Sequence, residues 1–373
     1  MRIERIEAFP VRYPTQGRFK FLESPDGKKV GRPAVLVKIT SDEGWVGWGE
    51  SVPMPTWTYE TLESAAAAIE HYLTPVLLGR DAFDLHGALQ AMNSVIKPGY
   101  TLGAPLTKAG VDIALHDLCA KQMGVSLAQW WGRATSEQVT LSWTLNPVSL
   151  EALETSLDEG WRRGYRNFNV KVAPDIETDI ALCHYVKERV PDGFLWADAN
   201  GGYDLATALK AAPKLADIGV DVLEAPIPPN QIEGYQRLRR QGALPIIMDE
   251  GVITPRDLLE FIRLGMLDGV AMKPARCGGL LSARRQIEIL QDAGLIFLGS
   301  GLTDPDISLQ ATLALYSAYG LAFPAALNGP QFLAHSVLTN PCRPHEGRLP
   351  APKGPGLGIE VDESMIESIR ADV

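Results

Sequence analysis

Five charged residues recur at nearly even intervals through the middle of the chain, each directly after a short apolar run. They are Lys171, Asp198, Glu224, Asp249 and Lys273, separated by 27, 26, 25 and 24 residues. Apolar runs that alternate with helical patterns indicate βαβ units and a parallel sheet. The carboxyl ends of parallel strands meet at one edge, where the catalytic residues of β/α barrels lie. One charge there can be a solvated cap, but five in successive units indicate a site.

The three consecutive acids predict a metal ion. Neighbouring strands lie about 4.8 Å apart, so Asp198, Glu224 and Asp249 can reach a common point, and like charges that close raise at least one pKa strongly. A divalent cation removes this conflict. Oxygen ligands alone, with positions left open for substrate, favour Mg²⁺, for which Mn²⁺ can substitute. The six histidines avoid these strand ends and no H-E-x-x-H motif occurs, which argues against zinc.

The two lysines predict acid–base chemistry on opposite sides of that metal. A partly desolvated lysine beside a dication loses its proton more readily and can act as a base near neutral pH. Lys171 and Lys273 could then serve opposite faces of one carbon, while the metal stabilises the charge that develops when a proton α to a carboxylate leaves. The alternative is that both lysines only pair with the carboxylates in a buried network.

Two unlike sets of elements would position these residues. From about residue 141, seven apolar runs begin 24 to 27 residues apart, and the uncharged stretch 308–328 supplies a helix pattern and a strand for an eighth unit. This regularity favours a closed barrel over an open sheet. Before it, residues 2–10, 35–40 and 46–50 predict a three-stranded antiparallel sheet, and 61–77 and 104–123 predict helices. The polar segment 15–33 predicts a long loop, either a lid or a plain surface loop.

Composition limits the class of protein. The 373 residues are 46% hydrophobic and 21% charged with a net charge of -10, typical of a globular protein with a real core. The acidic balance argues against nucleic-acid and membrane partners. Four scattered cysteines predict reduced thiols, and the amino-terminal residues lack a hydrophobic signal core, so we expect a cytoplasmic protein.

In order, these segments resemble the enolase superfamily and, within it, the muconate lactonizing enzyme (muconate cycloisomerase) subgroup of the mandelate racemase/muconate lactonizing enzyme family. Lys171 lies in the second lysine position of a K-x-K motif, and the segment from Lys273 to Gly279 matches K-x-x-x-x-G-G. The three acid segments and a terminal match complete the set: Asp198-Ala199-Asn200, Leu223-Glu224-Ala225-Pro226, Asp249-Glu250 and Pro355-Gly356-Leu357-Gly358. The similarity covers nearly the whole chain.

The resemblance implies an α/β fold, a (β/α)7β modified TIM barrel with an N-terminal α+β capping domain that the C-terminal segment completes. The domains would span 1–125, 126–335 and 336–373. It implies that Lys171 and Lys273 are catalytic and that Asp198, Glu224 and Asp249 bind Mg²⁺, as superfamily chemistry requires. Further residues are expected to orient these groups or to contact substrate: Asn169, Asn200, Glu250, Ser300, Asp304 and Trp57. Asn169 replaces the first lysine of the motif, and Asp304 has an alternative role as a helix cap, with Asp306 competing.

The implied activity is proton transfer α to the carboxylate of a small carboxylic acid, giving a racemase, an epimerase or a cycloisomerase. Two alternatives stay open. One is a lyase that dehydrates a hydroxy acid or a hydroxyproline-type substrate, and the other is a non-catalytic acid-binding homologue. A homo-oligomer, dimer or octamer, is expected from the resemblance.

Overall fold

The computed structural model describes residues 1–24 and 26–373. The amino-terminal part is an antiparallel sheet of three strands in the order β1-β2-β3, as the sequence predicts. These strands are β1 (Ile3–Tyr13), β2 (Arg32–Ser41) and β3 (Val46–Ser51). The predicted loop 15–33 lies mostly between β1 and β2, contains the short helix η1 (Lys20–Leu22), and is called the lid segment below. The turn Ser41–Gly44 is closed by a hydrogen bond from the Gly44 N–H to the Ser41 carbonyl.

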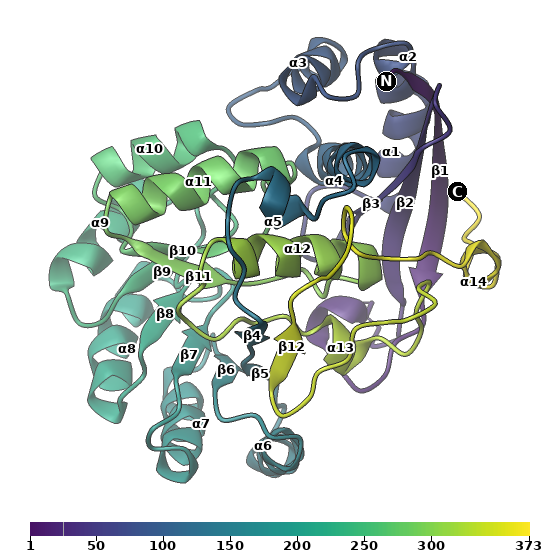
Figure 1. Ribbon diagram of the computed structural model, residues 1–373. Helices are drawn as coiled ribbons and strands as arrows, with labels where there is room; N and C mark the ends of the chain where they lie inside the picture. The colour runs from purple at the N-terminus through teal and green to yellow at the C-terminus, as the bar shows by residue number, and fades with distance from the viewer. Residues whose placement is uncertain (25) are drawn as a thin grey trace.

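Helices cover one face of this sheet and complete an N-terminal capping domain (Figure 1). The predicted helix over 61–77 is a continuous run of α1 (Leu62–Ala67), the π-helical η2 (Ala68–Leu73) and α2 (Thr74–Leu77). After α3 (Leu85–Val95) comes α4 (Pro105–Gln122), which is buried along nearly its whole length. Glycines let α4 approach the sheet closely, because a Cβ at Gly49 would lie 2.0 Å from the Gly110 carbonyl oxygen.

The central part is a parallel sheet of seven strands in the order β11-β10-β9-β8-β7-β6-β5. Every strand predicted from the apolar runs is present. The strands are β5 (Trp143–Leu145), β6 (Phe168–Lys171), β7 (Leu195–Asp198), β8 (Val222–Glu224), β9 (Ile246–Met248), β10 (Gly269–Met272) and β11 (Ile296–Gly299). The helices that connect them lie outside the strands (Figure 1): α6 (Leu150–Arg162), α7 (Ile176–Arg189), α8 (Leu205–Ile218), α9 (Ile232–Gln241), α10 (Pro255–Arg263) and α11 (Leu280–Asp292). Helix α12 (Asp306–Ala318) follows the last strand, β11.

The predicted eighth unit is only partly realised. Its helix is present as α12, but its strand is reduced to two isolated parallel bridges, Leu141 with Ala325 and Ser300 with Ala326. Pro324 directly precedes this short extended stretch and cannot donate to a strand ladder, and helix α13 (Gly329–Phe332) begins soon after it, so a longer strand does not form.

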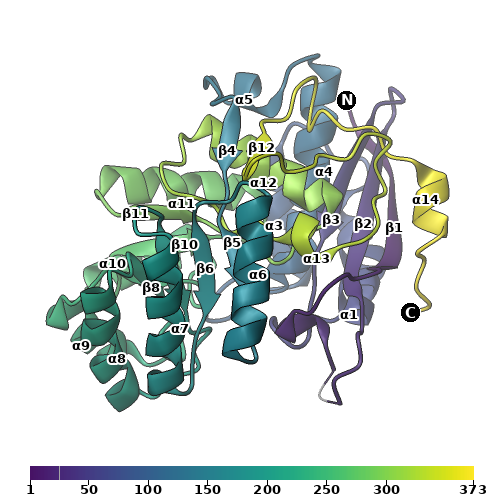
Figure 2. The ribbon, with the colours of Figure 1, turned by 90° about the horizontal axis from the view of Figure 1, so that it is seen from below.

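Five short elements remain among the described residues. They are α5 (Leu127–Trp130), β4 (Gln138–Thr140), α13 (Gly329–Phe332), β12 (Arg348–Pro350) and α14 (Glu363–Glu367). The C-terminal segment returns to the capping sheet, because the Arg12 N–H donates to the Ile369 carbonyl and the Ala371 N–H to that of Pro10. Figure 2 shows α14 and the C-terminus beside β1 and β2.

Candidate active site

Because side chains alternate along a strand, the charged residues lie on the same face of the parallel sheet as a buried apolar layer. A buried layer there consists of Trp196, Val222, Ile247, Ala271, Leu298 and Ala326. Residues i and i+2 of a strand face the same side. The five positions two residues after the members of β7 to β11 are Asp198, Glu224, Asp249, Lys273 and Ser300. The apolar layer therefore forms the floor, and the polar residues form the layer above it at the strand ends.

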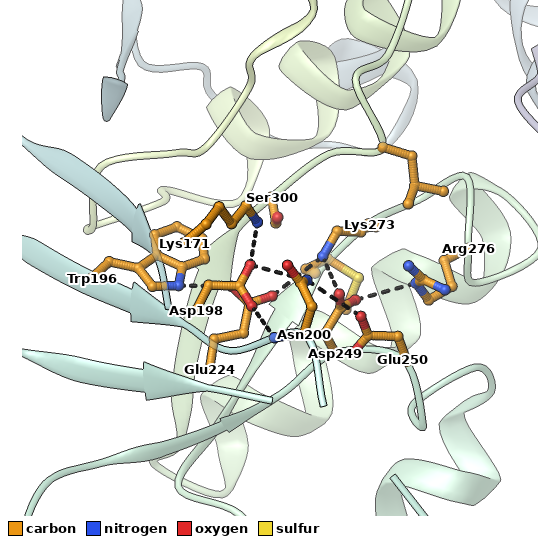
Figure 3. A network of polar contacts seen from close by, with 12 residues as sticks. Lys171, Trp196, Asp198, Asn200, Glu224, Asp249, Glu250, Lys273, Arg276 and Ser300 are labelled. Atoms are coloured by element: carbon orange, nitrogen blue, oxygen red, sulfur yellow. Dashed lines mark hydrogen bonds and ion pairs between the residues drawn. The ribbon is translucent and has the colours of Figure 1, made fainter. Parts of the chain in front are cut away.

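Strand register places the first three charged residues side by side. Lys171 pairs with Asp198 across β6 and β7, and Asp198 pairs with Glu224 across β7 and β8. Asp249 and Lys273 directly follow the ends of β9 and β10. The structure thus brings together all five residues that the spacing singles out (Figure 3).

The lysines pair with opposite ends of the row of acids. The Lys171 ammonium forms an ion pair with Asp198. The Lys273 Nζ lies 2.7 Å from Asp249 Oδ2 and 3.4 Å from Glu224 Oε1. The network that the alternative interpretation expects is therefore present. It leaves each ammonium beside the mouth, so it is equally the arrangement that two acid–base groups would need.

Burial dominates the electrostatics of two of the acids, Glu224 and Glu250. Burial and the neighbouring charge of Asp198 raise the pKa of Glu224 well above its usual value. Burial also raises the pKa of Glu250, to about 7, and the charge of Asp249 adds to this. For Lys273 burial acts in the lowering direction, but the charges of Asp249 and Glu224 outweigh it and raise its pKa. The lowered lysine pKa expected from the sequence requires a dication to offset these acids.

The donor set fits a hard divalent cation, although the carboxylates do not converge by themselves. Within residues 1–24 and 26–373, no three His, Cys, Asp or Glu side chains are already grouped to hold a metal ion. Both carboxylate oxygens of Asp249 are buried, and each is paired with a cation, Oδ2 with Lys273 and Oδ1 with Arg276. Three buried acids (Asp198, Glu224 and Asp249) and the half-buried Glu250 lie beside three cations (Lys171, Lys273 and Arg276), which leaves one net negative charge when all four acids are ionised. Oxygen donors with an excess of negative charge suit Mg²⁺ or Mn²⁺.

Neighbouring side chains hold the acids in place. The Asn200 backbone N–H donates to Asp198 Oδ1 at 2.9 Å, and its side-chain amide donates to Asp198 Oδ2 at 3.2 Å and to Glu250 Oε1 at 3.5 Å. Asn200 has φ 46°, a left-handed conformation that asparagine tolerates well. The Arg276 Nε lies 3.2 Å from Asp249 Oδ1.

Trp196 also belongs to the site, although the sequence did not single it out. Its indole N–H donates to Glu224 Oε2 at 2.7 Å (Figure 3). The signal was available, because Trp196 lies two residues before Asp198 and so faces the same side of β7. A buried indole N–H needs a partner.

A small cavity of about 10 Å³ lies at the centre of these residues. It has room for about one water molecule. Of the predicted contacts, Trp57, Asn169 and Ser300 line it, together with Lys171, Asp198, Glu224 and Lys273. Thr144, Gly301 and Asn328 complete the polar wall and were not predicted. The Asn169 amide is buried with no hydrogen-bond partner, so it can interact with a molecule bound there.

The lid segment supplies an aromatic roof. Phe21 stacks on Trp57 with ring centroids 4.3 Å apart, and Phe19 stacks on Phe332 of α13 at 4.7 Å. The Lys171 ammonium lies 6.0 Å from the Phe19 ring and 5.9 Å from the Trp57 ring. Residues of segment 15–33 therefore cover the mouth, as the lid interpretation predicts.

Asp304 lies away from the cavity wall, and neither it nor Asp306 caps α12. The first residues of that helix are capped by another strand, because the Ile307 and Ser308 N–H groups donate to Glu50 Oε2 of β3 at 3.1 and 2.9 Å. The cap interpretation of Asp304 and Asp306 is therefore wrong, since Pro305, whose side chain cannot accept a hydrogen bond, occupies the N-cap position and Glu50 accepts the free N–H groups.

The same fold recurs in known proteins. Residues 152–365 match the family model "Enolase C-terminal domain-like", and residues 27–132 match "Mandelate racemase / muconate lactonizing enzyme, N-terminal domain". The chain is 32% identical to muconate cycloisomerase 1 of Rhodococcus opacus, over 90% of this chain and 91% of that protein. It is 26% identical to an N-succinyl-L-Arg/Lys racemase of Bacillus cereus, over 99% and 98%.

Among solved structures, muconate lactonizing enzyme from Klebsiella pneumoniae superposes with a TM-score of 0.90 at 27% identity, over the full length of both chains. The chain therefore belongs to the mandelate racemase/muconate lactonizing enzyme family of the enolase superfamily. Its relatives are isomerases that act on small molecules, which confirms the expected class, an enolase-superfamily isomerase of the racemase and cycloisomerase kind. Enzymes of this family generally use a divalent metal ion. No helix of the described residues has the length and apolarity to span a membrane.

Proposed function

We propose that this protein is a Mg²⁺-dependent isomerase that moves a proton at the carbon α to a substrate carboxylate, with Lys171 and Lys273 as the proton-transfer groups. The observation that carries the proposal is the row of acids at adjacent strand ends with one lysine paired at each end. Both ammonium groups line one cavity, where they can serve opposite sides of a bound molecule.

Asp198, Glu224 and Asp249 would hold the ion, and Asn200 and Glu250 would orient them. When bound, Mg²⁺ would neutralise the buried acids and supply positive charge for the substrate carboxylate and for the charge that develops at its α-carbon. Lys171 would transfer the proton on one face of that carbon and Lys273 on the other. Trp196 holds Glu224 in its rotamer, and the aromatic roof excludes water, which strengthens the interactions inside.

The proposed substrate is a muconate-type dicarboxylate or the lactone it forms, because the relative with the highest identity named above is a muconate cycloisomerase. A second candidate is racemisation of an N-acylated amino acid. It is favoured by lysines on both sides of the cavity and by the racemase relative. Either substrate exceeds a 10 Å³ cavity, so the lid must move for it to enter.

We also infer that the sheet closes as a (β/α)7β barrel, supported by the bridges of Ala325 and Ala326 to residues beside its two edge strands. The division into 1–125, 126–335 and 336–373 is proposed with it, supported by the contact of the last segment with β1. The homo-oligomer and the cytoplasmic location stay predictions from the sequence.

The test is incubation in D₂O with Mg²⁺ and either muconolactone or N-succinyl-L-arginine, followed by mass spectrometry. A gain of about one dalton at the α-carbon is expected, and the product identifies cycloisomerisation or racemisation. Lys171→Ala should abolish exchange while Mg²⁺ still binds by calorimetry. Exchange at the wild-type rate in that variant would refute the role of Lys171, and loss of water would indicate a dehydratase. No exchange with Mg²⁺ bound would favour a non-catalytic acid-binding protein.

A further inference from the structure

Arg32, at the start of β2, is fully buried, and its hydrogen bonds within the described residues all go to backbone carbonyls. Its Nε donates to the carbonyls of Leu302 at 3.0 Å and Thr303 at 3.3 Å. Its Nη1 and Nη2 donate to the carbonyls of Pro53 at 2.8 Å and Val52 at 2.9 Å. One guanidinium therefore joins three segments that are far apart in the sequence: β2, the chain after β3, and the chain after β11.

The charge of this guanidinium is retained despite its burial. Burial lowers the pKa of Arg32 to about 10, and the charges of Asp304 and Glu50 oppose that shift, so the group stays protonated at neutral pH. Both acids belong to the same junction, because Asp304 lies in the chain after β11 and Glu50 caps α12. A planar group with five N–H donors is suited to bridging several oxygens at once, which an ammonium on a flexible stem does less well.

The two segments that Arg32 joins are two walls of the reaction cavity. Val52 and Pro53 lead directly into the turn in which the Trp57 N–H donates to the Met54 carbonyl, and Trp57 lines the cavity. The other segment begins with Ser300 and Gly301, which also line the cavity. A shift at Arg32 would change the distance between the indole of Trp57 and the β11 wall without touching the acids or lysines.

Thr303 carries a second, independent sign that this junction is held under constraint. It is fully buried with φ 54°, a left-handed conformation that β-branched residues strongly disfavour. Such outliers persist only where the surroundings enforce them. The group that bonds the Thr303 carbonyl is Arg32.

We propose that Arg32 is a positioning residue for substrate binding: it holds the Trp57 segment and the 300–304 segment at the separation that the bound carboxylic acid requires. The inference rests on the proposed function of the site. Arg32 would then contribute to substrate affinity without touching the substrate. Its substitution would leave the proton-transfer groups and the metal-binding acids in place.

The first test needs no substrate. Arg32→Lys keeps the charge and loses the bridging geometry, and hydrogen–deuterium exchange would follow the backbone amides. We expect faster exchange in both 54–58 and 300–308, with β6 to β9 as protected as in the wild type. Arg12→Lys, on the same sheet but half exposed in a surface ion pair with Glu63, is the matched control and should change neither segment. Faster exchange in one segment only, or throughout the chain, would overturn the proposal.

The second test uses muconolactone or N-succinyl-L-arginine, whichever the wild type converts. Arg32→Lys should raise KM by about tenfold or more, with kcat changed less than threefold and Mg²⁺ affinity unchanged, as expected when substrate binding rather than chemistry is lost. Thr303→Gly should keep the wild-type KM, because glycine adopts this φ freely. In the Arg32→Lys background it should reverse part of the KM increase.

Equal falls in kcat and Mg²⁺ affinity, or simple additivity of the two substitutions, would refute the positioning role. If the wild type converts neither compound, the proposed function fails, and the exchange experiment still decides the role of Arg32.

Discussion

Glu50 is the buried carboxylate whose removal should change stability most clearly with pH. It lies between the capping sheet and α12, accepts the Ile307 and Ser308 N–H groups, and accepts the Tyr13 hydroxyl at 2.8 Å. Burial raises its pKa from 4.5 to about 8, and the charges of Asp306 and Asp304 add to the effect of burial. The Arg32 guanidinium supplies the positive charge near these acids.

The sign follows from where the proton is held. Because the folded-state pKa is higher than the unfolded value, folding is favoured by proton uptake, so this contribution is complete below about pH 4.5 and is lost as the pH rises toward 8. Each unit of pKa is worth about 1.36 kcal/mol. The shift therefore corresponds to about 5 kcal/mol at most, and partial relaxation of the junction would reduce it.

Glu50→Gln replaces the acid with a neutral group of the same shape that can still accept from α12. Between pH 5 and pH 8.5 we expect the free energy of unfolding of the variant to fall less than that of the wild type. The two plots of unfolding free energy against pH should diverge by several kcal/mol. Urea unfolding followed by circular dichroism at constant ionic strength measures this. Glu4→Gln, exposed on β1, should follow the wild type. Parallel curves for wild type and Glu50→Gln would refute the reasoning, since Glu50 would then titrate alike in both states.

Three further predictions concern the site. Lys273→Met should slow racemisation or exchange by about 10²-fold or more, measured by mass spectrometry in D₂O, and an unchanged rate would remove Lys273 from the mechanism. Asn200→Ala should weaken Mg²⁺ binding by about 10- to 100-fold by calorimetry, because Asp198 loses the amide that orients it; unaltered affinity would contradict that role. Trp57→Ala should lower kcat/KM by up to about tenfold, because an aromatic pair such as Phe21–Trp57 contributes about 0.5–1.5 kcal/mol. Trp57→Phe should keep most of the wild-type kcat/KM. An equal loss in both variants would show that stacking on Phe21 is not what matters.

Much of the architecture could be predicted because it depends on the local pattern of apolar and polar residues. The recurrence of apolar runs reports burial, so strands β5 to β11 and the order of Lys171, Asp198, Glu224, Asp249 and Lys273 follow from spacing alone. The antiparallel capping sheet follows from strand-like runs around a turn for the same reason. The two-residue period of a strand also determines that these side chains share one face.

Other features depend on which distant segments meet. The sequence near α12 predicts a local cap by Asp304 or Asp306, but Glu50, more than 250 residues earlier, takes that place. Trp196 resembles any buried tryptophan until its N–H is found against Glu224. The eighth strand is reduced to two bridges, with Pro324 directly before it and helix α13 beginning at Gly329.

The sequence by itself determined the class of fold, the row of charged residues and the chemistry that those residue types allow, because periodicity and residue type are local properties of the chain. Only the tertiary structure decided which lysine pairs with which acid, how the aromatic roof of Phe19, Phe21 and Trp57 closes the cavity, and that Arg32 joins two of its walls. These are contacts between segments whose separation in the chain carries no periodic signal. Their geometry is set by close packing of the two parts of the molecule, in which each buried polar group must find a partner wherever one is brought within reach.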